Sequence, residues 1–137
     1  TVAALLFTAE EVYACNLGDS RIYRLRGRVL TQMSVDDSEP VPEGTGHGKP
    51  PLTQYLGVFP DELTLVPHLV KSALKPGDFY LLCSDGLTDL LPNVMIADCI
   101  RQHTSVRQIT EHLLRAALQN GGRDNVSVIG IKINELR

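Results

Sequence analysis

The sequence predicts an α+β protein in which antiparallel strands come first and helices cover one face of the sheet. Short strand-like runs with turn residues between them extend to Cys83, two stretches with helical spacing of apolar residues lie between Pro92 and Gln119, and a last strand-like run closes the chain. The 137 residues suffice for one domain with a hydrophobic core but not for two typical ones, so we expect a single domain over residues 1–137.

The first part of the chain predicts an antiparallel meander. Its expected strands are Val2–Phe7, Glu11–Leu17, Arg21–Leu25 and Val29–Met33. Gly18, Asp19 and Ser20 separate the second strand from the third, and such small, turn-forming residues suit a hairpin connection. Thr1 stands directly before a strand without an initiator Met, which we interpret as a cut into a longer protein.

The rest of the chain predicts a long loop, two strands, two helices and a final strand. From Ser34 to about Pro51 the chain is rich in proline and glycine, which favours an exposed segment without regular structure. Ser105 is the expected N-cap of the second helix, and Gly121 and Gly122 end it. The expected elements are strands Leu63–Val70 and Phe79–Cys83, the latter buried on both faces, helices Pro92–Arg101 and Val106–Gln119, and strand Val126–Ile133.

Composition excludes several classes of partner. The formal net charge of -3 gives no electrostatic reason to expect a nucleic acid or an anionic membrane. No apolar run approaches the roughly 20 residues that a membrane-spanning helix needs. The three cysteines are scattered and odd in number, which is typical of buried thiols in a reducing compartment. We therefore expect a cytoplasmic protein without a membrane segment.

Three aspartates stand at the ends of expected strands. Asp19 and Asp85 each follow a strand by two residues, and Asp124 precedes the last strand. If the first two strands run in the same sense and the last runs oppositely, the three carboxylates reach the same rim of the fold. Carboxylates gathered there repel one another unless a divalent cation neutralises them, and hard oxygen ligands favour magnesium or manganese. Gly86 allows close backbone approach, so its carbonyl oxygen is a further candidate ligand.

Each of these aspartates also has an ordinary explanation, because aspartate is a common turn and cap residue. Asp85 has the stronger claim since it follows a buried apolar strand, whereas Asp89 is expected at a helix start or beside a ligand. Arg21 is expected to form a local ion pair with Asp19 or to lie in solvent. The histidines show no metal-ligand spacing and are expected in surface or half-buried roles: His47, His68, His103 and His112.

Three strings of residues resemble the type 2C metal-dependent protein phosphatases. They are Asn16–Arg21 (NLGDSR), Leu81–Asp89 (LLCSDGLTD) and Gly122–Val128 (GRDNVSV). Any one string is a weak signal, but the three stand in the family's order and at its spacing. With the segments 1–7 and 35–38, the resemblance covers essentially the whole chain and is greatest to bacterial members.

The resemblance implies a fold and a set of site residues. The fold is a sandwich of two antiparallel sheets with outer helices and a flap-like loop at about 34–55, here the C-terminal part of the domain without its N-terminal strands and helices. Asp85 and Asp124 match two carboxylate ligands of a binuclear manganese or magnesium centre and are the catalytic candidates. Asp19 together with Asp85 matches the site of a third, weaker ion. No substrate-binding residue is identified.

The resemblance also implies a reaction, namely hydrolysis of phosphoserine and phosphothreonine in proteins by direct attack of water. Its partners would be a phosphoprotein substrate and a bacterial serine/threonine kinase or its targets. The first hypothesis is a piece of such an enzyme, inactive alone; the second is a non-catalytic interaction or regulatory module; the third is a small structural domain whose acids bind nothing. Missing strands would leave unpaired edges and an apolar face, so we expect the chain to dimerise, to pack against a companion N-terminal segment, or to be poorly stable.

Overall fold

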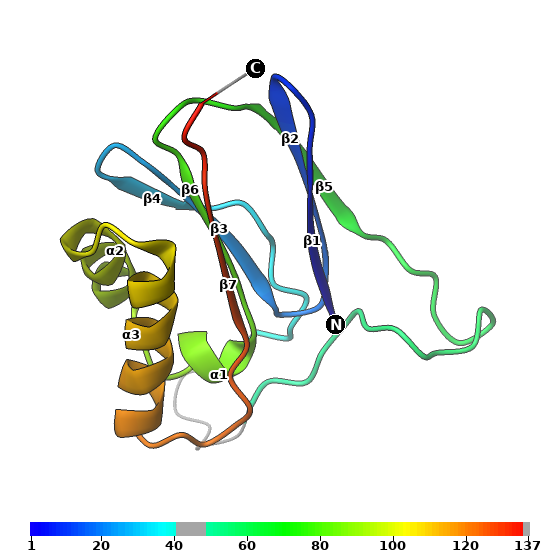
Figure 1. The fold of residues 1–137 in the computed structure, drawn as a ribbon. Coiled ribbons are helices and arrows are strands. Elements are labelled where there is room, and N and C mark those ends of the chain that lie inside the picture. The colour runs from blue at the N-terminus through cyan, green and yellow to red at the C-terminus, as the bar shows by residue number, and fades with distance from the viewer. Residues whose placement is uncertain (41–48, 136–137) are drawn as a thin grey trace.

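The protein forms two antiparallel sheets packed face to face, with helices on the outer face of one sheet (Figure 1). The computed structural model describes residues 1–40 and 49–135. The strands are β1 (Val2–Phe7), β2 (Glu11–Leu17), β3 (Arg21–Arg26), β4 (Val29–Gln32), β5 (His68–Ala73), β6 (Phe79–Cys83) and β7 (Val128–Lys132). The helices are α1 (Asp85–Thr88), α2 (Asn93–Gln102) and α3 (Val106–Gln119). The predicted α+β sandwich is confirmed.

The strand order brings distant parts of the chain together at one end of the sandwich. One sheet has the order β1-β2-β5 and the other β4-β3-β6-β7, with every pair antiparallel. A turn at Gly18, whose φ of 98° suits glycine, reverses the chain between β2 and β3. Since β3 is antiparallel to β6, strands β2 and β6 run in the same sense and β7 runs oppositely.

Two apolar layers stabilise this arrangement. Val12 and Ile22 belong to the layer between the sheets, where Phe7 and Tyr80 make an edge-to-face contact with ring centroids 5.4 Å apart. Tyr23 and Ile109 belong to the layer between the second sheet and the helices. Because β6 contributes to both layers, all five of its residues are buried, as its uninterrupted apolar sequence predicts.

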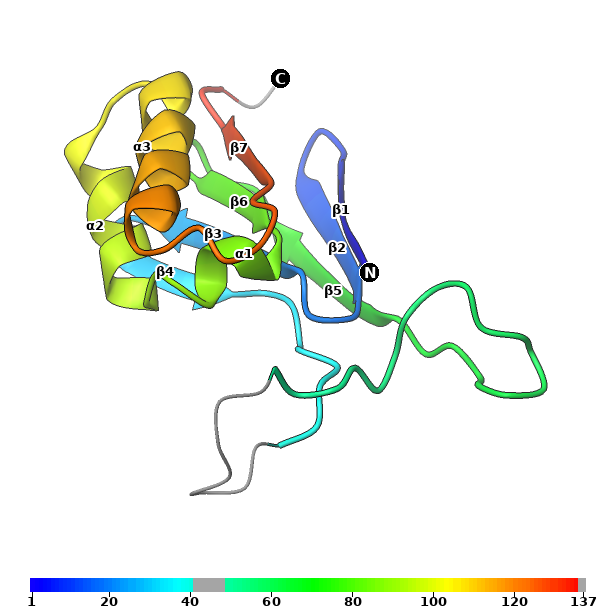
Figure 2. The same cartoon turned by 90° about the horizontal axis from the view of Figure 1, so that it is seen from below.

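The helices cover the outer face of the β4-β3-β6-β7 sheet (Figure 2). The Ser105 hydroxyl caps α3 by accepting a hydrogen bond from the Gln108 amide at 3.4 Å, which confirms the predicted N-cap. The α3 helix packs closely on β7, because a Cβ atom added at Gly130 would lie 3.0 Å from Val106 and 3.1 Å from Thr110. Within the described residues, no helix is long and apolar enough to cross a membrane.

Three local predictions differ from the structure, the first being the last strand, which begins at Val128 instead of the expected Val126. The expected strand Leu63–Val70 begins only at His68, where pairing with β2 starts, and residues 63–67 have no strand partner within the described chain. The short helix α1 was not predicted, because four residues are too few to show a helical period. Of the long loop, residues 41–48 lie outside the described part, and the segment leading to β5 extends away from both sheets (Figure 2).

Candidate metal centre

The loops bearing Asp19, Asp85 and Asp124 leave the same end of the β4-β3-β6-β7 sheet. Arg21, Cys83 and Val128 form one row across three neighbouring strands. Asp19 lies two residues before Arg21, Asp85 two residues after Cys83, and Asp124 four residues before Val128. The three loops therefore start from the same rim of the sheet, which is the strand arrangement that the predicted convergence requires.

The loops of Asp85 and Asp124 are held together by their backbones. Ser84 N donates to Ser127 O at 3.1 Å, while Ser127 N donates to Ser84 Oγ at 2.9 Å. A Cβ atom at Gly86 would lie 2.2 Å from Asn125 O, so only glycine permits this approach. These contacts fix the relative position of the two aspartates before any ligand binds.

The carboxylates of Asp85, Asp89 and Asp124 surround one cation, the ammonium group of Lys49. Lys49 Nζ forms an ion pair with Asp85 Oδ2, and it lies 3.5 Å from Asp124 Oδ2 and 3.8 Å from Asp89 Oδ2. The Asp85 side chain is 20% exposed and that of Asp124 52% exposed, so the first is the more enclosed carboxylate. A cleft of about 460 Å³ opens here, lined by Lys49, Pro50, Gly86, Asp89, Leu90, Arg123 and Asp124.

The donor chemistry of this cleft fits magnesium or manganese. Asp85 and Asp124 offer hard carboxylate oxygens, and the Lys49 ammonium group marks a position between them where a positive charge is stabilised. Within residues 1–40 and 49–135, however, no group of three or more His, Cys, Asp or Glu side chains is arranged to hold one metal ion. The described residues therefore supply only part of a coordination sphere.

The NLGDSR turn positions the segment that leads into the loop. The Asp37 carboxylate is 9% exposed, accepts a hydrogen bond from Gly18 N at 2.8 Å and contacts His68 Nε2 at 2.6 Å. The Asn16 amide donates to Val35 O at 2.6 Å and accepts from Val35 N at 3.1 Å. Asp19 itself is half-buried, and no ion pair links it to another side chain within the described residues.

The expectation that Arg21 pairs with Asp19 or lies in solvent is wrong. Its guanidinium group forms a bidentate ion pair with Asp36, with Arg21 Nη2 2.6 Å from Asp36 Oδ2 and Nε 3.0 Å from Asp36 Oδ1. Arg21 Nη1 also donates to Tyr23 Oη at 3.0 Å. Asp36 lies in the segment after β4 and contacts Arg21 from there. The sequence around Asp19 does not reveal this contact.

Cys83, the last residue of β6, is a buried thiol beside this centre. Burial raises its pKa to about 12, and the nearby Arg21 guanidinium only partly opposes that effect. All three cysteines are free, with Cys15 and Cys99 half-buried, which agrees with the expected absence of a disulfide framework.

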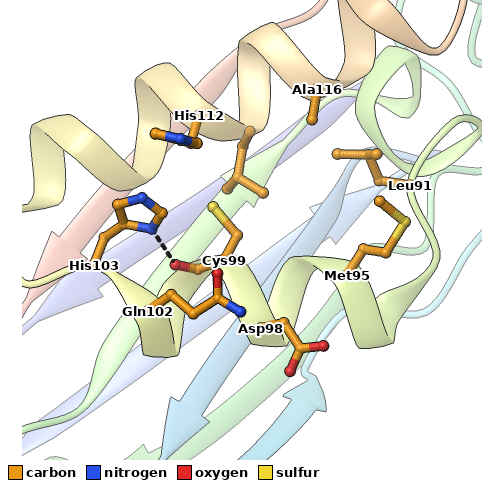
Figure 3. Close-up of a pocket in the computed structure, with 9 residues that line it drawn as sticks. Leu91, Met95, Asp98, Cys99, Gln102, His103, His112 and Ala116 are labelled. Atoms are coloured by element: carbon orange, nitrogen blue, oxygen red, sulfur yellow. Dashed lines mark hydrogen bonds between the residues drawn. The ribbon is translucent and has the colours of Figure 1, made fainter.

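A second cavity, of about 290 Å³, lies between α2 and α3 (Figure 3). It is lined by Leu91, Met95, Asp98, Cys99, Gln102, His103, His112, Leu113 and Ala116. The rings of His103 and His112 lie 4.1 Å apart, and His103 Nδ1 is 2.9 Å from Cys99 O. His68, His103 and His112 thus have the expected surface or half-buried positions, while His47 lies outside the described residues.

Comparisons with known proteins agree with this geometry. No protein-family model matches the chain. The chain is 34% identical to the serine/threonine protein phosphatase PstP of Mycobacterium tuberculosis, over 94% of the chain and 26% of that protein. It is 32% identical to the protein phosphatase PhpP of Streptococcus pneumoniae, over 98% of the chain and 58% of that protein.

Solved structures share the fold. The catalytic domain of PstP in complex with two manganese ions matches with a TM-score of 0.79 and 30% identity, over 97% of this chain and 58% of that one. The serine/threonine phosphatase of S. agalactiae matches with a TM-score of 0.85 and 25% identity, over 96% of this chain and 58% of that one. The chain therefore spans at most about three fifths of these relatives. It belongs to the type 2C family of serine/threonine protein phosphatases.

Proposed function

We propose that the chain is part of a cytoplasmic phosphatase that hydrolyses phosphoserine and phosphothreonine in proteins. Asp85 and Asp124 are its metal ligands, within a centre of two manganese or magnesium ions. The observation that supports this proposal is the contact of one cation, the Lys49 ammonium group, with both carboxylates. The PstP structure with two manganese ions supports the choice of metal.

When bound, such ions supply Lewis acidity and lower the pKa of water. The contribution of this chain is to hold the ligands in place, because the hydrogen bonds between Ser84 and Ser127 join the loops that carry Asp85 and Asp124. Asp19, with Asp85, would hold a third, weaker ion, and the Gly86 carbonyl would be a further ligand. The remaining ligands of the two-ion centre would come from a companion segment, since the described residues hold no complete group.

The partners follow from the proposed reaction. The substrate is a phosphoprotein, and a bacterial serine/threonine kinase or the targets of such a kinase are the expected signalling partners. The loop at about 34–55 is proposed as the flap of a single partial domain over residues 1–137. Two of its described residues, Lys49 and Pro50, line the cleft, which supports this proposal.

A chimaeric protein tests the function. The chain replaces the matching part of the S. agalactiae phosphatase, and manganese-dependent hydrolysis of a phosphothreonine peptide is measured for the chain alone and for the chimaera. We expect activity in the chimaera only. Asp85→Asn and Asp124→Asn should each lower kcat/KM by at least about 100-fold, since each removes a charged ligand oxygen.

The matched control is Asp61→Asn, which makes the same chemical change at an exposed residue outside the cleft and should leave kcat/KM unchanged. If the chimaera binds manganese but hydrolyses nothing, the chain is a non-catalytic interaction module instead. Full activity in Asp85→Asn and Asp124→Asn would refute the assignment of these two ligands.

A further inference from the structure

We infer that Lys49 is an internal counter-cation of the metal centre: its ammonium group neutralises Asp85 and Asp124 in the metal-free protein and competes with the metal ion for them. This inference rests on the proposed function, in which these two aspartates are metal ligands. It assigns to Lys49 a role in setting metal affinity, and it makes the position of the Lys49 side chain dependent on metal.

The contacts of Lys49 support this role. Its nitrogen atom contacts Asp85 Oδ2 and lies within 4 Å of oxygens from both Asp89 and Asp124, so three carboxylates share one positive charge. Arg123 lines the same cleft, but among the described residues no ion pair joins it to these aspartates. Lys49 is therefore the cation that occupies the position between the two proposed ligands.

The backbone that carries Lys49 is anchored. Glu39 N donates to Pro51 O at 3.0 Å, Thr53 N donates to Asp37 O at 2.9 Å, and Ser38 pairs with Leu52 in an isolated bridge. Asp37 is in turn bonded to Gly18 N in the β2–β3 turn. Lys49 is therefore only two residues from the hydrogen-bonded Pro51, which limits the positions that its ammonium group can reach.

The difference in charge decides whether Lys49 or a metal ion occupies the position between the carboxylates. One ammonium charge leaves the three carboxylates with a net charge of about -2, whereas a divalent ion brings twice the positive charge to the same oxygens. The Lys49 side chain is 43% exposed, so its ion pairs are weak enough to be exchanged. Binding of a metal ion should release Lys49 from Asp85 and Asp124.

Zero-length cross-linking tests the contact directly in this chain. A water-soluble carbodiimide activates a carboxylate, and an adjacent amine displaces the urea by-product to form an amide bond that mass spectrometry locates. We expect a cross-link from Lys49 to Asp85, Asp89 or Asp124 in metal-free protein, and its loss on addition of Mn²⁺. Absence of the cross-link without metal, or its persistence at every Mn²⁺ concentration, would overturn the inference.

Variants of Lys49 test the competition. Lys49→Gln should tighten Mn²⁺ binding, measured by calorimetry, about threefold to tenfold, because the competing charge is removed. Lys49→Arg should retain affinity near that of the wild type. The matched control is Lys75→Gln, which changes the net charge equally at an exposed residue near the other end of β6. Equal Mn²⁺ affinities of Lys49→Gln and Lys75→Gln would overturn the inference.

The tests of Lys49 and the test of the proposed function can fail independently of each other. If Mn²⁺ abolishes the cross-link while the chimaera hydrolyses no phosphopeptide, the counter-cation role stands and the phosphatase activity fails. If the chimaera is active but Lys49→Gln binds Mn²⁺ no more tightly than Lys75→Gln, the phosphatase activity stands and the role of Lys49 fails.

Discussion

Asp78 is a carboxylate with almost no exposed surface, and its partners join the two sheets. Arg26 donates to it from β3 through two nitrogens at 2.8 and 2.7 Å, and the same guanidinium group donates to Ala73 O at the end of β5. Burial acts to raise the pKa of Asp78, but hydrogen bonds from Arg26, the Lys75 amide and Tyr80 Oη outweigh it, so that the pKa lies below the ordinary 3.8.

This pKa predicts an acid-dependent stability. Because the folded-state pKa lies below the ordinary value, the stabilisation by Asp78 is fully present above about pH 4 and is lost as the pH falls through the folded-state pKa. Asp78→Asn should cost roughly 1–3 kcal/mol of unfolding free energy at pH 7 and should reduce the loss between about pH 5 and pH 2. Urea titrations across this pH range measure both effects.

The control for Asp78 is Asp98→Asn on α2, where the side chain is 49% exposed and pairs with Arg101 within one helix. This substitution should change the unfolding free energy by no more than about 1 kcal/mol, because exposed ion pairs contribute little to stability. If Asp78→Asn and the wild type lose the same unfolding free energy as the pH falls, protonation of Asp78 does not cause the loss of stability in acid.

The sequence predicts the positions of some site residues but not of others. The Asp85 and Asp124 positions could be predicted because each adjoins a strand with a clear pattern, and strand direction then fixes the shared rim. The partner of Arg21 and the position of Lys49 could not be predicted, because Asp36 and Lys49 lie on the long connection between β4 and β5 and the path of that connection brings them to Arg21 and Asp85. No local spacing encodes that path.

At the scale of elements, the helix α3 and strand β7 meet at Gly130. A Cβ atom there would lie 2.9 Å from Phe79 Cζ in β6 and 3.0 Å from Val106 in α3, so the interface has no space for a methyl group. Gly130→Ala should lower the unfolding free energy by about 1–3 kcal/mol through overpacking, measured by the midpoint of urea denaturation.

Lys132→Ala provides the comparison for this interface. Lys132 lies two residues further along β7 with an exposed side chain, so its substitution should leave the midpoint within about 0.5 kcal/mol of the wild type. An unchanged midpoint in Gly130→Ala would show that α3 moves freely on the sheet, in contradiction to the packing described above.

The elements that the sequence predicted well are those with strong local signals. Helix α3 has a capping serine and a glycine stop, and β6 is apolar throughout, so both were predicted with their observed bounds. Strand β5 depends instead on pairing with β2, and its residues Leu69 and Val70 are exposed, so no alternating pattern marks where it begins.

At the scale of the whole molecule, β1 and β7 are edge strands, and among the described residues neither pairs with a strand on its outer side. Ala3 and Leu5 of β1 and Ile131 of β7 pack against the apolar layer between the sheets, while Ile129 of β7 is 58% exposed. Ala3, Leu82 and Ile129 help to line a cavity of about 250 Å³ on this side of the sandwich. An apolar layer that opens beside edge strands favours association with further strands.

We predict that the chain associates through this side. Sedimentation equilibrium should show self-association of the wild type, and Ile129→Lys should weaken it about tenfold or more, since it places a charge in the apolar contact. The control is Val94→Lys on α2, where the side chain is 62% exposed, and it should leave the self-association unchanged. A wild-type chain that remains monomeric at every concentration would contradict the prediction.

The fold class and the rim of carboxylates followed from the sequence because they depend on strand pattern and on order along the chain. The pairing at the outer edges of β1 and β7 does not follow from these patterns, and the chain spans only part of the length of its relatives. A companion segment that supplied metal ligands and also covered these edges should change metal affinity and oligomeric state together.

The buried thiol of Cys83 has a consequence for how the centre responds to oxidants. Because burial raises its pKa to about 12, the Cys83 thiol stays protonated at neutral pH. Hydrogen peroxide and alkylating reagents attack thiolates, so this sulfur should stay unmodified while the fold is intact. Oxidants that inactivate enzymes with a cysteine nucleophile should therefore leave both Cys83 and the carboxylates of the proposed metal centre unmodified.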